Sequence, residues 1–209
     1  MKVTALYAGG YASVSYLVTD AAETAAVIVD PSYSYDALCR LRQTLPPISA
    51  IVLTHGHFDH MLRLEEWRAR TRAPVLIGAE DACALTDPRR SCFWQFLSRE
   101  DRFASADRLL CEGDTVAVGK EGLTVLHTPG HTAGSICLGA DGFLLCGDTV
   151  FADGYGRTDL PSGDRATLRR SLRRLMALPD DTVLYPGHGD AAVVADCRWA
   201  LAAEGMIAE

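Results

Sequence analysis

The sequence lacks the long apolar run of a membrane protein and the basic excess of a nucleic-acid-binding protein. Nowhere do about 18 apolar residues follow one another, so we expect no segment to span a membrane. The formal net charge of −7 does not suit partners held through phosphates or anionic lipid headgroups. The N-terminal segment is interrupted by Gly9 and Gly10 and has no apolar stretch typical of an export signal. We therefore expect a cytoplasmic protein with no nucleic-acid or membrane partner.

The chain also lacks paired cysteine motifs, linkers and repeats. Its seven cysteines are scattered, odd in number and without CxxC spacing, which indicates reduced thiols, most of them small core residues. No Pro/Gly/Ser-rich stretch or change in composition divides the 209 residues, and 48% of them are hydrophobic. We therefore predict one domain over residues 1–209.

Short apolar or β-branched runs alternate with longer stretches of helical spacing. We expect strands at residues 2–7, 13–20, 25–30, 49–54, 73–78, 114–118, 123–128, 135–139, 142–148 and 182–186. We expect helices near residues 35–44, 60–70, 80–85, 164–177 and 190–203. In the fourth helix, the apolar stripe of Leu168, Leu172 and Leu175 lies opposite four arginines, Arg169, Arg170, Arg173 and Arg174. This spacing predicts that the arginine face is solvated. This pattern favours two packed sheets with helices outside or a single mixed sheet, and periodicity alone does not choose between them.

Half of the six histidines lie in the stretch THGHFDHM, directly behind the apolar run ISAIVL. His55, His57, Asp59 and His60 fall within six positions. Residues that leave a buried strand at the rim of a sheet can converge on one point. Imidazole and carboxylate are ligands that suit zinc, iron or manganese. A single histidine is more often a hydrogen-bonded core or surface residue, but this density favours a metal site.

Three further ligand-type side chains follow apolar strands in glycine-containing turns: His131, Asp148 and His188. The seven candidates exceed the four ligands of one tetrahedral ion. A carboxylate can bridge two cations, so we predict a site for two metal ions with Asp148 shared between them. The remaining histidine, His127, lies within a strand. We expect it to support a ligand from behind through a hydrogen bond, or to be a satisfied core histidine, rather than to bind metal.

The motif HGHFDH, followed in order by His131, Asp148 and His188, resembles the metal-binding pattern of the metallo-β-lactamase superfamily. The resemblance implies an α/β fold, an αββα four-layer sandwich with the metal site at one rim of the two sheets. Carried over by position, it implies a first metal site of His55, His57 and His131. It implies a second metal site of Asp59, His60 and His188, with Asp148 bridging both.

The same resemblance implies a cofactor and a mechanism. Two divalent metal ions are expected, with zinc as the expected metal and iron or manganese as alternatives. A metal-bridging hydroxide would attack a carbonyl group, and Asp59 would be the catalytic residue that orients the hydroxide or takes up its proton.

The segment GDTVFADGYGRTDLPSGD resembles the glyoxalase II-like, or hydroxyacylglutathione hydrolase-like, group of thioesterases. In its Gly-Arg-Thr-Asp turn we expect Arg157 and Asp159 to brace the site, with an ordinary capped turn as the alternative. Glyoxalase II itself holds glutathione with a C-terminal helical region. Here about twenty residues follow His188, with Arg198 as their one basic residue, so the compact single-domain members match better. The resemblance therefore implies a metal-dependent hydrolase for a small thioester, without glutathione recognition by that route.

Other activities remain open at this point. A persulfide dioxygenase would hold one iron with His55, His131 and Asp148. A lactonase would need the same hydroxide, and a β-lactamase or a nuclease is less favoured because an export signal and a basic surface are missing. An inactive metal-binding scaffold is disfavoured because no ligand is missing.

Neither the acyl group of the substrate nor the oligomeric state follows from the sequence, but the walls of the substrate pocket can be predicted. We expect the substrate pocket to be walled by the turn at residues 7–13, the insertion at 87–101 and the loop at 151–156. Phe93, Trp94 and Phe96 in that insertion are expected in core or lid packing, with a groove for an apolar acyl group as the alternative.

Overall fold

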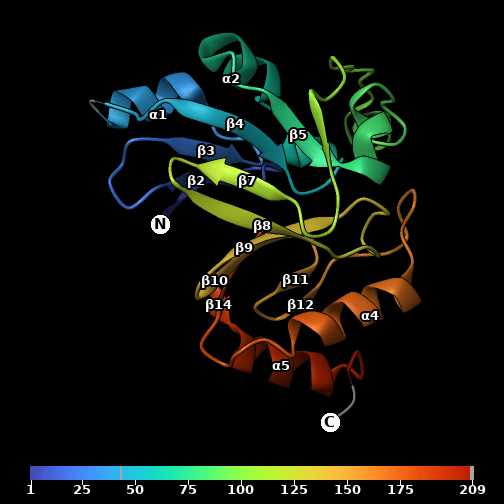
Figure 1. Ribbon diagram of the computed structural model, residues 1–209. Helices are drawn as coiled ribbons and strands as arrows, with labels where there is room; N and C mark the ends of the chain where they lie inside the picture. The colour runs from blue at the N-terminus through green and yellow to red at the C-terminus, as the bar shows by residue number, and fades with distance from the viewer. Residues whose placement is uncertain (43, 208–209) are drawn as a thin grey trace.

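Two six-stranded sheets face each other between two layers of helices in the computed structural model, which describes residues 1–42 and 44–207 (Figure 1). The first sheet has the order β1 (Lys2–Tyr7), β2 (Val14–Thr19), β3 (Ala26–Val29), β4 (Ile48–Leu53), β5 (Val75–Gly78) and β6 (Arg108–Leu110). The second has the order β14 (Ala192–Val193), β13 (Val183–Pro186), β10 (Phe143–Gly147), β9 (Ile136–Ala140), β8 (Glu121–His127) and β7 (Thr115–Val118). A small hairpin consists of β11 (Val150–Phe151) and β12 (Gly154–Tyr155).

The helices cover the outer faces of the sheets. Helices α1 (Tyr35–Leu41) and α2 (Leu64–Thr71) lie over the first sheet, and α4 (Arg165–Leu175) and α5 (Val194–Ala203) lie under the second (Figure 1). The connecting segments contain the short helix α3 (Phe93–Leu97) and the 3-10 helices η1 (Phe58–His60) and η2 (Ala79–Leu85).

Three buried apolar clusters separate the four layers. Alternation along β4 shows how one strand serves two of them. Ile51 and Leu53 pack with Trp67 of α2, whereas Val52 packs between the two sheets. The third cluster joins the second sheet to α4 and α5, for example through Leu144. A strand covered on both faces reads as a continuous apolar run, as ISAIVL does. The expected αββα four-layer sandwich is confirmed.

All ten predicted strands are present, but two of the predicted helices begin later than expected. The helix predicted from His60 begins at Leu64, because residues 58–60 form η1 instead. The helix predicted from Asp190 begins at Val194, because Ala192 and Val193 pair with β13. The structure also contains the short elements β6, α3, β14 and the β11–β12 hairpin, which the sequence pattern did not reveal. Residue 43, at the end of the first predicted helix, lies outside the described residues.

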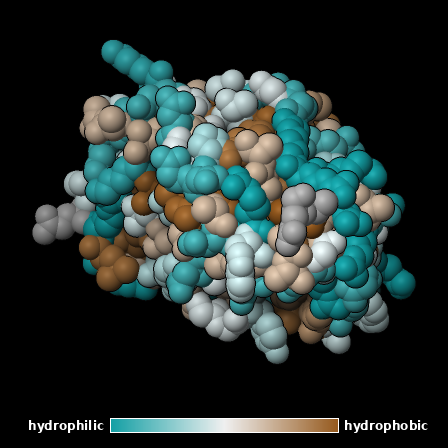
Figure 2. Space-filling model, turned by 90° about the horizontal axis from the view of Figure 1, so that it is seen from below, coloured by the Kyte–Doolittle hydropathy of each residue, from teal (hydrophilic) through white to brown (hydrophobic). Residues whose placement is uncertain are grey.

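The amphipathic helix α4 begins where its capping residue predicts. The Asp164 side chain accepts a hydrogen bond from the Thr167 amide at 2.6 Å, which satisfies a free donor of the first turn. Leu168, Leu172 and Leu175 are buried. The four arginines opposite them are exposed, and Figure 2, which views the molecule from the side of α4 and α5, shows hydrophilic and apolar residues interspersed. The predicted solvated face is confirmed.

All seven cysteines are free thiols, and Cys92, Cys137, Cys146 and Cys197 are buried. Within residues 1–42 and 44–207, no helix is both long and apolar enough to cross a membrane.

Strand direction places the predicted ligands at one rim. Strands β3 and β4 are parallel, so their carboxyl ends lie side by side in the first sheet. In the second sheet β10 and β13 are parallel, and β8 runs in the same direction because both β8 and β10 are antiparallel to β9. The residues that follow these strands therefore leave each sheet at its carboxyl-end rim.

Candidate metal centre

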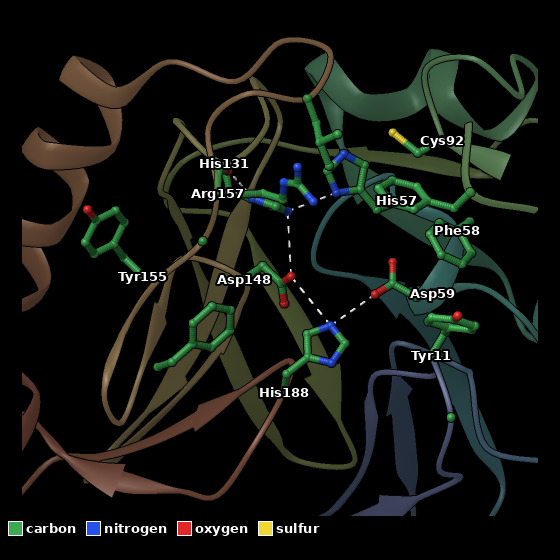
Figure 3. A pocket seen from close by; sticks show the side chains of 15 residues that line it. Tyr11, His57, Phe58, Asp59, Cys92, His131, Asp148, Tyr155, Arg157 and His188 are labelled. Carbon is green, nitrogen blue, oxygen red and sulfur yellow. Dashed lines mark hydrogen bonds and ion pairs between the residues drawn. The ribbon is translucent and has the colours of Figure 1, made fainter. Parts of the chain in front are cut away.

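The structure brings all seven predicted ligands together in one site between the two sheets. Five of them are drawn in Figure 3: His57, Asp59, His131, Asp148 and His188. His55 and His57 follow β4, and Asp59 and His60 belong to η1. The other three follow β8, β10 and β13.

The ligand atoms include the two groups that the resemblance implies, and a third set, His55, His60 and Asp148, links them. Those of His55, His57 and His131 all lie within 4.8 Å of one another, and the same holds for Asp59, His60 and His188. Nδ1 of His57 is 2.9 Å from Nε2 of His131. Nε2 of His188 is 3.0 Å from Oδ2 of Asp59. Each group thus aims three ligand atoms at one small volume.

Asp148 lies between the two groups. Its Oδ2 is 3.7 Å from Nε2 of His131 in the first group and 3.6 Å from Nε2 of His188 in the second. Its Oδ1 is 3.2 Å from Nε2 of His60. One carboxylate therefore faces ligand atoms of both groups, which is the placement expected of a bridging ligand.

Several polar atoms of the site have no hydrogen-bond partner among the described residues. They include Nε2 of His55 and Nε2 of His57, and both are buried. A buried polar atom without a partner is costly, about 1–3 kcal/mol each. Metal coordination would satisfy such atoms, and the imidazole and carboxylate donors fit zinc, iron or manganese.

Burial and mutual proximity keep two of the histidines neutral. Burial, together with the neighbouring histidines, holds the pKa of His55 well below its usual value of 6.5. Burial and His131 lower the pKa of His57 to about 3. Because a metal binds the neutral imidazole, both rings are in the ligating state at neutral pH.

The carboxylates and the remaining histidines shift one another in opposite directions. Burial raises the pKa of Asp59 and Asp148, but nearby histidines, chiefly His60, outweigh it and the net pKa of each carboxyl falls. Burial alone would lower the pKa of His60 and His188, but the facing carboxylates raise it above the usual value. In the metal-free protein these shifts favour ionised Asp59 and Asp148 beside His60 and His188, which keep their protons to a higher pH than a free histidine does.

Asp30 supports the second group and was missed at the sequence level. Its carboxylate accepts hydrogen bonds from Nδ1 of His60 at 2.8 Å and from the amide and hydroxyl of Thr54 at 2.8 and 2.7 Å. These bonds fix the ring of His60 and the turn that precedes His55. The sequence did contain a sign of this role, because Asp30 ends the apolar run AVIVD just as each ligand follows an apolar strand. Unlike the ligands that follow the later strands, however, Asp30 has no glycine turn beside it.

Asp81, in η2, joins the loops that carry the first group. Its carboxylate accepts hydrogen bonds from the Gly56 amide at 2.9 Å, the Gly134 amide at 2.8 Å and the Thr132 hydroxyl at 2.6 Å. Gly56 stands between two ligands of the first group, and Thr132 follows the third. A Cβ atom at Gly134 would lie 2.4 Å from the Asp81 amide nitrogen, so the close approach requires glycine. One buried carboxylate thus sets the distance between the two loops.

Replacing Asp81 with asparagine is expected to weaken metal binding about 10–100-fold, because outer partners of metal ligands typically contribute that much. The amide turns a donor toward backbone N–H groups, so stability should also fall by about 1–3 kcal/mol. Competition with a chromophoric chelator measures the affinity, and urea unfolding of the metal-free protein measures the stability. Glu80→Gln, an exposed neighbour in η2, is the control. Equal metal affinity in both variants would remove Asp81 from this role.

The residues expected to brace the site differ in whether they contact a ligand side chain. His127 bonds through Nε2 to the Ala133 carbonyl at 2.8 Å. Its hydrogen bonds among residues 1–42 and 44–207 include none to a ligand side chain, so of the two expected roles this contact favours the hydrogen-bonded structural histidine. Arg157 does brace the site, but through its backbone, because its carbonyl oxygen is 2.7 Å from Nδ1 of His131. The guanidinium pairs with Asp159 through two contacts of 2.7 Å, and this hydrogen bond lowers the pKa of Asp159 to about 2.

A cavity of about 550 Å³ opens over the ligands. All three predicted walls contribute, with Tyr11 from the first turn, Phe96 from the insertion and Tyr155 from the third segment. In Figure 3, Tyr155 lies on one side of the ligands, and Phe58 and Tyr11 lie on the other. Of the other two aromatic residues of the insertion, Phe93 is core and Trp94 lines a separate surface hollow.

Known proteins resemble this chain over most of its length. A family profile described as the Metallo-beta-lactamase superfamily matches residues 8–188. An uncharacterized protein of Mycobacterium leprae is 37% identical over 210 residues, covering 93% of this chain and 94% of the relative. A hydroxyacylglutathione hydrolase of Rhodospirillum rubrum is 35% identical over 175 residues, which are 83% of this chain but only 60% of that enzyme.

Solved structures repeat the fold. The B3 metallo-beta-lactamase BLEG-1 has a TM-score of 0.86 at 30% identity, covering 93% of this chain and 95% of that chain. ETHE1 from Myxococcus xanthus has a TM-score of 0.74 at 30% identity, covering 94% and 81%. TTHA1623, described in a di-iron-bound form, has a TM-score of 0.78 at 30% identity, covering 93% and 96%.

Proposed function

Because the chain belongs to the metallo-beta-lactamase superfamily, we propose that it is a metal-dependent hydrolase whose substrates are small thioesters. The observation that carries the proposal is the complete set of seven ligand-type side chains, several with buried atoms that lack other partners. The similarity to a hydroxyacylglutathione hydrolase supports the thioester class, although the chain spans about 60% of that relative's length. Two divalent metal ions held by these residues would lower the pKa of a bound water and polarise a carbonyl oxygen.

The chain's own groups fit proton uptake at the floor of the cavity. Asp59 lines the cavity, and the pKa of its carboxyl is lowered by His60 and His188 despite the opposing effect of burial. Its Oδ2 is held 3.0 Å from Nε2 of His188, which orients the carboxylate. An ionised, oriented carboxylate that faces the reacting volume is suited to accept the proton of an attacking water.

The weak proton donors of the cavity favour a thiolate leaving group. A free thiol has a pKa of about 8.5, so a thiolate departs without being protonated, whereas an amine does not. Beyond the ligands, the cavity offers the hydroxyls of Tyr11 and Tyr155 and the thiol of Cys92, whose pKa is raised to about 11 by burial. Arg157 is already paired with Asp159. These groups suit a thioester better than an amide.

The proposal is tested by assaying the purified protein on S-lactoylglutathione and a small acyl-thioester panel, without oxygen, with metal analysis of the same sample. The expected result is hydrolysis that a chelator abolishes and added zinc or manganese restores. Absence of hydrolysis, with one iron per chain and with oxygen uptake on glutathione persulfide in a parallel aerobic assay, would favour the persulfide dioxygenase instead. Iron is included in the metal analysis because the similar protein TTHA1623 is described in a di-iron-bound form.

A further inference from the structure

We propose that the acyl part of the substrate is an uncharged apolar or aryl group larger than acetyl, held against Phe96. The inference rests on the proposed thioester hydrolysis and names the substrate class within it. The cavity, the charges around it and the placement of Phe96 each contribute to the argument.

Beyond the metal ligands, the cavity is walled mainly by apolar and aromatic side chains. They are Tyr11, Phe58, Phe96, Phe151, Tyr155 and Leu160. The volume of about 550 Å³ lies within the range of about 300–1,000 Å³ that is usual for small-molecule sites. Apolar surface of a ligand that is covered by a wall of this kind is removed from water, which favours binding.

Phe96 is an exposed side chain on a rigid support. Its ring stacks on the buried ring of Phe58 with centroids 5.5 Å apart and an interplanar angle of 23°. Phe58 in turn contacts Phe93 in the core, with centroids 5.7 Å apart. Nevertheless 44% of Phe96 is exposed, at the cavity wall. A fixed, half-exposed aromatic ring beside reactive groups is a preformed contact for an apolar ligand.

The charges of the wall disfavour an acidic acyl group. Among the described residues that line the cavity, Arg157 is the one arginine, and there is no lysine. Its guanidinium is engaged by both carboxylate oxygens of Asp159 and lies 5.9 Å from the centroid of the Phe96 ring. The one arginine of the wall is thus already engaged by a carboxylate and lies beside the Phe96 ring, and no lysine or second arginine among the described lining residues offers another cation.

Trp94 provides a matched control on the same helix. It is 48% exposed, nearly as much as Phe96, but it lines a separate surface hollow with Arg89 and Gln95. Truncation of either ring removes exposed aromatic surface from α3. Only truncation of Phe96 removes it from the cavity.

The experiment compares wild type, Phe96→Ala, Phe96→Leu and Trp94→Ala on acetyl, hexanoyl and benzoyl thioesters of one uncharged thiol. We expect wild type to prefer hexanoyl or benzoyl over acetyl by about 10-fold or more in kcat/KM, because each well-packed methylene can contribute that much. Phe96→Ala should lose most of this preference, chiefly through a raised KM for the hexanoyl and benzoyl thioesters. Phe96→Leu should restore it in part, and Trp94→Ala should behave as wild type.

The outcomes separate this inference from the proposed function. If wild type hydrolyses all three thioesters equally, the thioesterase stands and the apolar acyl class is wrong. If Phe96→Ala and Trp94→Ala have the same effect, Phe96 does not determine specificity. If wild type hydrolyses no thioester at all, the proposed function fails and this inference fails with it. Thermal unfolding of each variant shows whether a lost rate is only lost fold, and Phe96→Leu keeps the test valid if Phe96→Ala does not fold.

Discussion

Replacing Asp59 with asparagine is expected to lower kcat for hydrolysis by about 10²–10⁴-fold, the usual contribution of a general base. Asparagine keeps the size of the side chain but cannot take up a proton. The fold should survive, because the bonds that anchor this position use its backbone: its carbonyl oxygen accepts from the Ser13 amide and the Ser32 hydroxyl. Steady-state kinetics gives the rate, and metal analysis with circular dichroism shows whether ions and fold are retained.

The control for this variant is Asp141→Asn. Asp141 is exposed in the turn between β9 and β10, at the opposite end of these strands from Asp148. The Asp141→Asn substitution removes the same charge at a position outside the site, so the activity of this variant should match that of wild type. A fully active Asp59→Asn protein would contradict the role given to Asp59 and with it the assignment of the site.

The convergence of the candidate ligands could be predicted because the strands that they follow can be recognised from local sequence. Each ligand follows an apolar run that is recognisable without its partners, as His55 follows ISAIVL and Asp148 follows FLLCG. Such runs are strands whichever neighbours they pair with, and glycines mark where each chain turns out of the sheet. That the chain uses two sheets instead of one was not contained in the periodicity, since β4 is apolar on both faces in either arrangement.

The supporting residues could not be found in the same way, because their roles arise from contacts between distant segments. Asp81 is 25 positions from Gly56 and 53 from Gly134, and nothing near it in sequence identifies either partner. The helix predicted from His60 begins later than expected for a related reason. The bond from His60 to Asp30 holds that residue in η1, so tertiary contacts override the helical spacing. Strands of two residues, such as β14, have no period to detect and exist through their pairing.

Removal of the metal ions is expected to abolish activity and to make the remaining stability depend on pH in a specific way. In the metal-free protein the pKa of His60 and of His188 is raised by the facing carboxylates, although burial opposes the shift. Such groups stabilise the fold fully below the unfolded pKa of about 6.5, and this stabilisation is lost as pH rises through the folded pKa. Burial lowers the pKa of His55 and His57, so these residues cost stability as pH falls below about 6.5. The four histidines together predict a stability maximum of the metal-free protein near pH 6.5.

Metal binding should show the opposite trend above that pH, because an ion in the second group must displace protons from His60 and His188. The apparent affinity of the second group is expected to rise with pH above about 6.5, by up to about two logarithmic units per pH unit for two displaced protons. Calorimetric titration in buffers of different ionisation enthalpy counts the protons released, and thermal unfolding of the chelated protein across the same range locates the stability maximum. His127→Gln lies outside the ligand set and should leave both curves unchanged. Asp30→Asn removes a carboxylate that raises the pKa of His60, so it should release fewer protons. An affinity that does not vary with pH in wild type would mean that His60 and His188 are not displaced by metal, and the second group would then not be a metal site.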